Sequence, residues 1–218
     1  MDNKFVPKKL EYTASTWGPL LWRSRLLPEI VEEFSRRAAL VRGVDELNAE
    51  TELAALMHDE WQYTPEDHDW SQEVLNPWVQ TYMKAFAQYA EHEYCPVPWS
   101  LKAIWVNFQH QNEVNLLHNH SGSLSFVLYL DVPEEIVEES HEYKNRGGKP
   151  GMIQFVHGSG GALYNNKKQY MPEKGDIFLF PSSLEHMVIP FKSPVERVSV
   201  AGNIILADTE NSSYQQYY

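Results

Sequence analysis

The sequence predicts a mainly β protein with helices at its N-terminal end. Apolar residues recur at helical spacing within the first hundred positions, whereas from Ser100 onward short β-prone runs are separated by glycine, proline and asparagine. With 218 residues, 43% of them hydrophobic, the chain can bury one sizeable core. These observations predict a single domain, 1–218, built as a β-sandwich or barrel with helices on one face.

Two helices are expected in an N-terminal support region, 1–99. The first runs from Pro28 to Arg42, because proline suits a first helical turn and apolar residues follow at helical spacing. The second is expected from an N-cap at Ser71 to about Glu93, with one apolar stripe along it. The stripe consists of Val74, Trp78, Tyr82, Ala85, Phe86 and Tyr89. Between the helices, Tyr63–Trp70 is expected to form a loop near the mouth of a site.

The core is expected in 100–206, and its strands are predicted by short apolar runs between turn residues. The expected strands are Ala103–Phe108, Ser123–Val132, Gly151–Val156, Gly161–Tyr164, Asp176–Phe180, His186–Phe191 and Val195–Leu206. The charged, glycine-punctuated segment Glu134–Lys149 is expected to be a solvated loop inserted between core strands. Residues 207–218 are expected to be a polar tail.

Composition excludes several classes of protein. A formal net charge of −12 disfavours nucleic acid as a partner, because nonspecific affinity for the phosphate backbone comes from lysine and arginine. Cys95 is the only cysteine, so the chain can form neither an internal disulfide nor a zinc-thiolate cluster. No apolar run reaches the roughly 20 residues that a membrane span needs, and the start of the chain lacks a signal-peptide core. We therefore expect a cytoplasmic protein, and a homodimer is left open.

Alternation along two predicted strands places polar side chains in the interior. If Ser123–Asp131 is extended, its leucines face the helices while the hydroxyl groups of Ser125 and Tyr129 point inward. On the last strand Arg197 and Ser199 share one face. A buried guanidinium needs a partner, because an unpaired charge in the interior is costly. A dicarboxylate would fit, since arginine offers a planar fork that matches a carboxylate.

Three histidines are spaced as ligands of one metal ion. His118 and His120 lie one residue apart just ahead of a strand, and His186 lies much further along the chain. Imidazole nitrogens with open coordination positions suit transition metals such as iron, zinc, nickel or copper. A carboxylate from Asp131 or Glu185 remains an alternative to one of the histidines.

The motifs around these residues resemble those of the iron(II) and 2-oxoglutarate dependent oxygenases. The resemblance rests on Trp105-Val106-Asn107, His118-Asn119-His120, Ser123–Pro133, Lys174–Ser182, His186 and Arg197-Val198-Ser199. It covers about residues 100–206 and is strongest to a small 2OG-Fe(II) oxygenase group of bacteria and phages. The chain departs from most of the superfamily at His120, where a carboxylate is usual.

The resemblance implies a fold, two cofactors and a set of site residues. The fold is a double-stranded β-helix, a jelly-roll barrel like that of the cupins. His118, His120 and His186 would bind Fe(II), with no catalytic residue beyond the metal centre. The residues expected to bind 2-oxoglutarate are Arg197, Ser199, Tyr129, Asn107 and Ser125.

The expected activity is hydroxylation of a small molecule or amino-acid-like substrate, coupled to decarboxylation of 2-oxoglutarate to succinate. Two alternatives remain open at this point. One is a three-histidine, cupin-type dioxygenase that does not use 2-oxoglutarate, and the other is a non-catalytic metal-binding module. Succinate release would separate the first reading from both alternatives.

Overall fold

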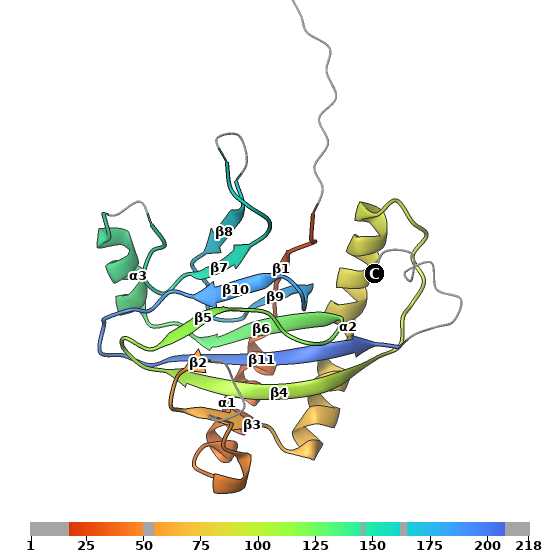
Figure 1. Ribbon diagram of the computed structural model, residues 1–218. Helices are drawn as coiled ribbons and strands as arrows, with labels where there is room; N and C mark the ends of the chain where they lie inside the picture. Colours follow the sequence, from red (N-terminus) through yellow and green to blue (C-terminus); the bar gives the residue numbers. More distant parts are fainter. Residues whose placement is uncertain (1–17, 50–54, 145–146, 162–164, 208–218) are drawn as a thin grey trace, which may run out of the picture.

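The computed structural model describes residues 18–49, 55–144, 147–161 and 165–207, and its strands form two antiparallel sheets (Figure 1). The larger sheet has six strands in the order β1-β9-β6-β11-β4-β3. In that order the strands are Trp22–Arg25, Asp176–Pro181, Leu124–Asp131, Arg197–Leu206, Trp99–Gln109 and Glu60–Gln62. β11 therefore lies between β6 and β4, where it is paired on both sides.

The smaller sheet has five strands in the order β2-β5-β10-β7-β8. These strands are Ala55–Leu56, Val114–His118, Glu185–Val188, Ile153–Val156 and Lys167–Tyr170. The prediction of a mainly β protein is thus confirmed. The expected closed barrel is not observed, because the described strands pair within two separate sheets.

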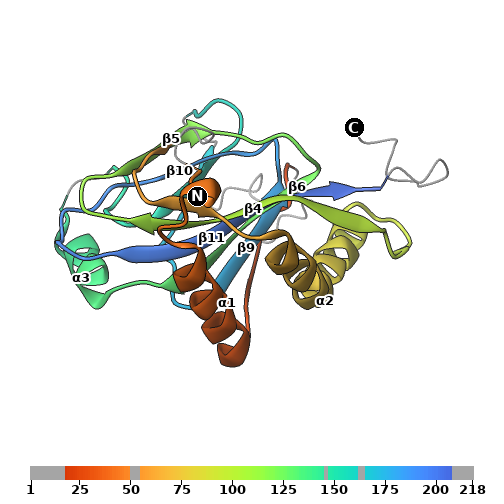
Figure 2. The same cartoon turned by 90° about the horizontal axis from the view of Figure 1, so that it is seen from below.

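Two long helices cover one side of the larger sheet. Figure 2 shows α1 (Pro28–Val41) and α2 (Pro65–Tyr89) on one side of that sheet, with β5 and β10 on the opposite side. A short 3-10 helix, Asp45–Leu47, follows α1. Among the described helices, none combines the length and the hydrophobicity that a membrane crossing requires.

α1 matches its prediction, whereas α2 begins earlier than expected. Thr64 is the N-cap of α2: its hydroxyl accepts the Asp67 backbone N–H, and the Asp67 carboxylate accepts the Thr64 backbone N–H in return. Pro65 follows at the first helical position, where its missing N–H costs nothing. Ser71 is therefore a buried residue inside the helix, and most of the expected loop Tyr63–Trp70 is helical.

The core between the helices and the sheet is apolar, as strand alternation predicts. Leu124, Leu128 and Leu130 of β6 are buried in one cluster with Phe34 of α1 and Leu75 of α2. The opposite face of β6 points toward the smaller sheet, and Tyr129 belongs to a second buried cluster there. The period of two along β6 thus separates the helix-covered core from the interior of the sandwich.

Other elements differ from the prediction. Within the expected loop Glu134–Lys149, residues Glu134–Glu142 form α3, which buries Ile136. The Glu139 side chain of α3 accepts the backbone N–H groups of Lys192 and Ser193, which ties the helix to the loop before β11. Positions 162–164 of the expected strand Gly161–Tyr164 lie outside the described residues.

The N-terminal region is not purely helical. β1 pairs with β9 at one edge of the larger sheet, and β3 pairs with β4 at the other edge. β2 adds to the smaller sheet beside β5. These strands have four residues or fewer, too short for the periodicity that identifies strands in a sequence.

Candidate metal centre and adjoining cavities

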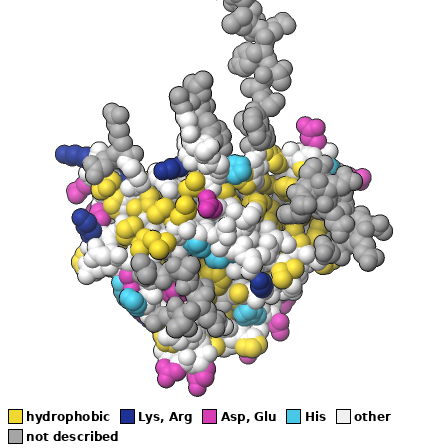
Figure 3. Space-filling model, in the orientation of Figure 1, with side chains coloured by type: hydrophobic (Ala, Val, Ile, Leu, Met, Phe, Trp, Pro, Cys, Tyr) yellow, Lys and Arg dark blue, Asp and Glu magenta, His cyan; other side chains and the backbone are white. Residues whose placement is uncertain are grey.

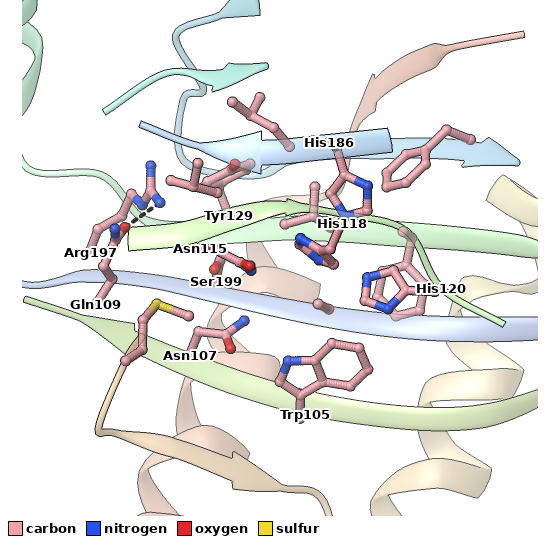
Figure 4. A pocket seen from close by; sticks show the side chains of 17 residues that line it. Trp105, Asn107, Gln109, Asn115, His118, His120, Tyr129, His186, Arg197 and Ser199 are labelled. Atoms are coloured by element: carbon pink, nitrogen blue, oxygen red, sulfur yellow. Dashed lines mark hydrogen bonds between the residues drawn. The ribbon is translucent and has the colours of Figure 1, made fainter. Parts of the chain in front are cut away.

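Three histidine side chains converge in the interior of the sandwich (Figure 4). His118 is the last residue of β5, and His186 of β10 lies directly opposite it in the antiparallel pairing. His120 lies in the loop after β5, and its backbone N–H donates to the Ser182 carbonyl at 2.9 Å. One ring nitrogen from each histidine lies within 4.8 Å of the other two, which suits coordination of a single ion.

The surroundings keep these imidazoles neutral and orient two of them. Burial lowers the pKa of His120 to about 4 and that of His186 to about 3, and it also lowers the pKa of His118. Nδ1 of His118 lies 2.6 Å from the Leu116 carbonyl oxygen, and Nδ1 of His186 lies 3.0 Å from that of Leu184. As donors to these carbonyls, the Nδ1–H groups leave Nε2 free to bind a metal.

A narrow cavity of about 40 Å³ extends from the histidines toward β11. A row of polar side chains lines it, because the register places Ser199 of β11 opposite both Tyr129 of β6 and Asn107 of β4. The Tyr129 hydroxyl and the Asn107 Oδ1 are buried and have no hydrogen-bond partner among the described residues. Such atoms are rare in folded proteins, and they indicate a place where a ligand or a water molecule binds.

Arg197 lies at the far end of this cavity. Its residue is 2% exposed, and its guanidinium donates to the carbonyl of Gly151 at 2.7 Å and to the Gln109 side chain. In the part of the chain that the structure describes, no carboxylate pairs with it, and its Nε has no partner. Burial lowers the pKa of Arg197 because no anion offsets the loss of hydration. The cavity therefore ends at a buried cation that has only neutral partners among the described residues.

The structure brings most of the expected site residues together. Tyr129, Asn107, Ser199 and Arg197 line the cavity with the three histidines. Ser125 is not among the lining residues; its buried hydroxyl donates to Asn203 and contacts the Ser182 hydroxyl.

The carboxylates of Asp131 and Glu185 are not part of the histidine group. Both residues are exposed, and Glu185 precedes His186 on a strand, so its side chain points to the opposite face. Among the described residues the site thus offers three neutral nitrogen donors and no carboxylate oxygen.

Three residues that line the cavity, Trp105, Gln109 and Asn115, were given no site role in the sequence analysis. The Trp105 ring packs edge-on to that of His120, with the centroids 5.8 Å apart, and Gln109 holds the guanidinium of Arg197. A signal for both was present, because Trp105, Asn107 and Gln109 alternate along β4 and so share one face. Asn115, on β5, also lines the cavity; it could not be found because β5 was not expected as a strand.

Comparison with known proteins places this geometry in context. Residues 103–203 match a family model described as "Putative 2OG-Fe(II) oxygenase". No curated protein sequence matches the chain.

Several solved structures share the fold. A prolyl-4-hydroxylase of Pseudomonas putida is 15% identical, with 84% of this chain and 90% of that chain covered and a TM-score of 0.50. The non-heme alpha ketoglutarate dependent carbocyclase SnoK from nogalamycin biosynthesis is 13% identical over 91% and 86%, with a TM-score of 0.53. The epimerase SnoN from the same biosynthesis is 13% identical over 85% and 78%, also with a TM-score of 0.53. At such identities the likeness shows a common fold and leaves the reaction open.

Proposed function

We propose that this protein is an iron(II) and 2-oxoglutarate dependent oxygenase that hydroxylates a small molecule or amino-acid-like substrate; the match of residues 103–203 to the 2OG-Fe(II) oxygenase model supports this. Substrate oxidation would be coupled to decarboxylation of 2-oxoglutarate to succinate. The observation that carries the proposal is one cavity lined both by three converging histidines and by a buried arginine that has no acid partner among the described residues. We assign the two sheets to the double-stranded β-helix architecture on the same grounds.

The residues present fit both cofactors. His118, His120 and His186 would hold the iron through neutral nitrogens, which suit a transition metal. Arg197 would pair with the far carboxylate of 2-oxoglutarate, and the Tyr129 and Ser199 hydroxyls would add hydrogen bonds. When bound, iron(II) with 2-oxoglutarate would supply the chemistry that activates oxygen for oxidation of the substrate. The protein supplies orientation and a site that excludes water.

Asn107 and Ser125 have different roles in this proposal. The orphaned Oδ1 of Asn107 would accept a hydrogen bond from a water or ligand group in the cavity. Ser125 would not contact 2-oxoglutarate directly, since its hydroxyl hydrogen-bonds with Ser182 and Asn203 and does not line the cavity. Ser182 also accepts the backbone N–H of His120, so this buried group holds the loop that carries a proposed metal ligand.

A three-histidine dioxygenase that does not use 2-oxoglutarate is the second candidate. The absence of a carboxylate from the described histidine group favours it. The buried Arg197 favours the first candidate, because its guanidinium is placed to pair with the far carboxylate of a 2-oxoglutarate bound at the histidines. Halogenation is less attractive, because it needs a coordination position that His120 would fill.

The metal assignment is tested by iron binding. We expect about one iron(II) per chain, and we expect His118→Ala, His120→Ala and His186→Ala each to abolish tight binding, because each removes one of three donors. The control is His141→Ala, since His141 is exposed on α3, away from the cavity. Stoichiometric iron in the His120→Ala protein would remove His120 from the ligand set.

The reaction assignment is tested by two measurements. Anaerobic calorimetry with iron present should detect 2-oxoglutarate binding, and exposure to oxygen should release succinate. Oxygen uptake without succinate would favour the three-histidine dioxygenase, whereas neither signal would leave a non-catalytic metal-binding module. His120→Asp should lower succinate release if the site is built around three neutral ligands. A variant much faster than the wild-type protein would contradict that view of the site.

A further inference from the structure

The histidine group lies between two cavities rather than in one. Trp105, His118 and His120 line both the narrow cavity that ends at Arg197 and a second, outer cavity of about 560 Å³. The outer cavity has the usual size of a small-molecule pocket, about 300–1,000 Å³, whereas the inner cavity must widen to admit 2-oxoglutarate. If 2-oxoglutarate occupies the inner cavity, as proposed above, the outer cavity is where a substrate can approach the same metal ion.

The outer cavity has an unusual charge for this protein. Lys102 is the only charged residue among its described lining residues, which include no aspartate or glutamate. The whole chain, in contrast, has 30 acidic against 18 basic residues. In Figure 3 histidine side chains reach the surface near the centre of this face, and most acidic side chains lie toward its periphery. The lining of the outer cavity thus has the opposite sign to the protein as a whole.

The neighbouring histidine does not alter this charge. His68 of α2 lines the outer cavity, and burial lowers its pKa although the carboxylates of Asp67 and Asp69 oppose that shift. His68 is therefore mainly neutral at pH 7. The carboxylate of Asp67 is paired with Arg37, which reduces its effect on the cavity.

Two side chains of the outer cavity are arranged as hydrogen-bond donors. The Lys102 ammonium donates to the Ser121 hydroxyl at 2.7 Å, which anchors it at the cavity and leaves its other protons available. The Oδ1 of Asn203 accepts the Ser125 hydroxyl at 2.8 Å. Since the carbonyl oxygen is engaged, the Nδ2 of Asn203 is the atom that can donate to a ligand.

We propose that the outer cavity binds the primary substrate, and that this substrate is a small metabolite with a free carboxylate held by Lys102 and Asn203. The inference rests on the proposed oxygenase function and adds the chemical class of its substrate. A carboxylate fits because its oxygens accept hydrogen bonds from these two donors and its negative charge would offset the positive charge of Lys102. The polar remainder of the lining, including Gln62 and Asn119, suits an amino or hydroxy acid better than a hydrocarbon.

The test uses matched pairs of small molecules. Amino, hydroxy and aliphatic carboxylic acids, each paired with its primary amide, are titrated calorimetrically into the anaerobic protein with iron(II) and saturating 2-oxoglutarate. Some acids should bind about three- to tenfold tighter than their amides, because an exposed ammonium contributes less than a buried one. Lys102→Gln should remove this preference. Lys84→Gln should keep it, since Lys84 is exposed on α2 and does not line the cavity.

Measurements on the same sample distinguish failure of the proposed oxygenase function from failure of the proposed substrate class. Failure of 2-oxoglutarate to bind in the first titration would refute the proposed function. With 2-oxoglutarate bound, equal affinity for acids and amides would overturn the substrate class, and so would the absence of any binding acid. An acid preference that survives Lys102→Gln would overturn the role of that lysine. Tighter binding of extended peptide amides than of the free acids would assign the cavity to a peptide instead.

Discussion

Replacing Arg197 with methionine should change ligand binding and stability in opposite directions. Arg197 is a buried cation that contacts the Gly151 carbonyl and the Gln109 side chain, both neutral acceptors. Arg197→Met keeps much of the side-chain length and removes the charge. We expect weaker 2-oxoglutarate binding, little change in iron binding, and a protein without 2-oxoglutarate that is at least as stable as the wild type.

The magnitudes follow from what the structure shows around the guanidinium. Truncating one partner of a buried, hydrogen-bonded charge pair costs about 2–5 kcal/mol, which corresponds to roughly a 30- to 5,000-fold increase in Kd. Before 2-oxoglutarate binds, the substitution loses two hydrogen bonds, each of about 1 kcal/mol. It also removes a buried charge, and replacing such charges with apolar groups often stabilises a protein by about 1–4 kcal/mol.

Two assays on each protein separate these effects. Anaerobic calorimetry measures 2-oxoglutarate and iron(II) binding, and urea denaturation without ligands measures the free energy of unfolding. The control is Arg36→Met, because Arg36 is exposed on α1 and its only hydrogen-bond partner among the described residues is Glu33. Unchanged 2-oxoglutarate affinity in Arg197→Met would refute the cosubstrate role. A large loss of stability without ligands would show that the guanidinium is structural rather than held for a ligand.

Three further predictions concern stability. The metal-free protein should lose stability as the pH falls from about 6.5 toward 4, because the pKa values of His120 and His186 are lower in the folded protein and the unfolded chain takes up protons first. Urea titrations across this range should show the free energy of unfolding decreasing as the pH falls, and His186→Phe should make that decrease smaller. Thr64→Ala should cost about 1 kcal/mol in urea unfolding by removing the cap of α2, whereas Thr81→Ala inside the helix should not. Gly202→Ala should lower the free energy of unfolding by about 1–3 kcal/mol, because the added Cβ would lie 2.5 Å from Phe126 Cε1 and 2.9 Å from the Ala103 carbonyl oxygen. The control is Gly147→Ala, whose added Cβ meets nothing within 4 Å, and thermal unfolding compares the two variants.

The sequence predicted those helices and strands that are long enough to show a clear hydrophobic periodicity. α1 was found from its apolar spacing, and the two faces of β6 were assigned from alternation alone. The start of α2 was missed, although Thr64, Pro65 and Asp67 form a capping signal, because the aromatic and charged residues around them read as a loop. α3 was missed because Ile136 is the only apolar residue that it buries.

The candidate site was more predictable from sequence than its surroundings. The three histidines, Arg197 and Tyr129 carry chemistry that their residue types reveal. Gln109 and Asn203 act through contacts across paired strands, and that pairing depends on the register of β11 with β4 and β6. A sequence gives the alternation within one strand, but the register between strands is set by tertiary packing. The outer cavity combines residues from α2, β4 and the loop after β5, so it becomes visible only in the folded chain.

The strand order has a consequence for any attempt to isolate the segment that matches the family model. The match spans residues 103–203, yet both outermost strands of the larger sheet, β1 and β3, come from earlier in the chain. A fragment reduced to that segment would leave the backbone groups of β9 and β4 open to pairing with other molecules. It would also uncover the leucine face of β6 that α1 and α2 cover. We therefore expect a 103–203 fragment to self-associate, and we expect substitutions that weaken β1 or β3 to reduce solubility.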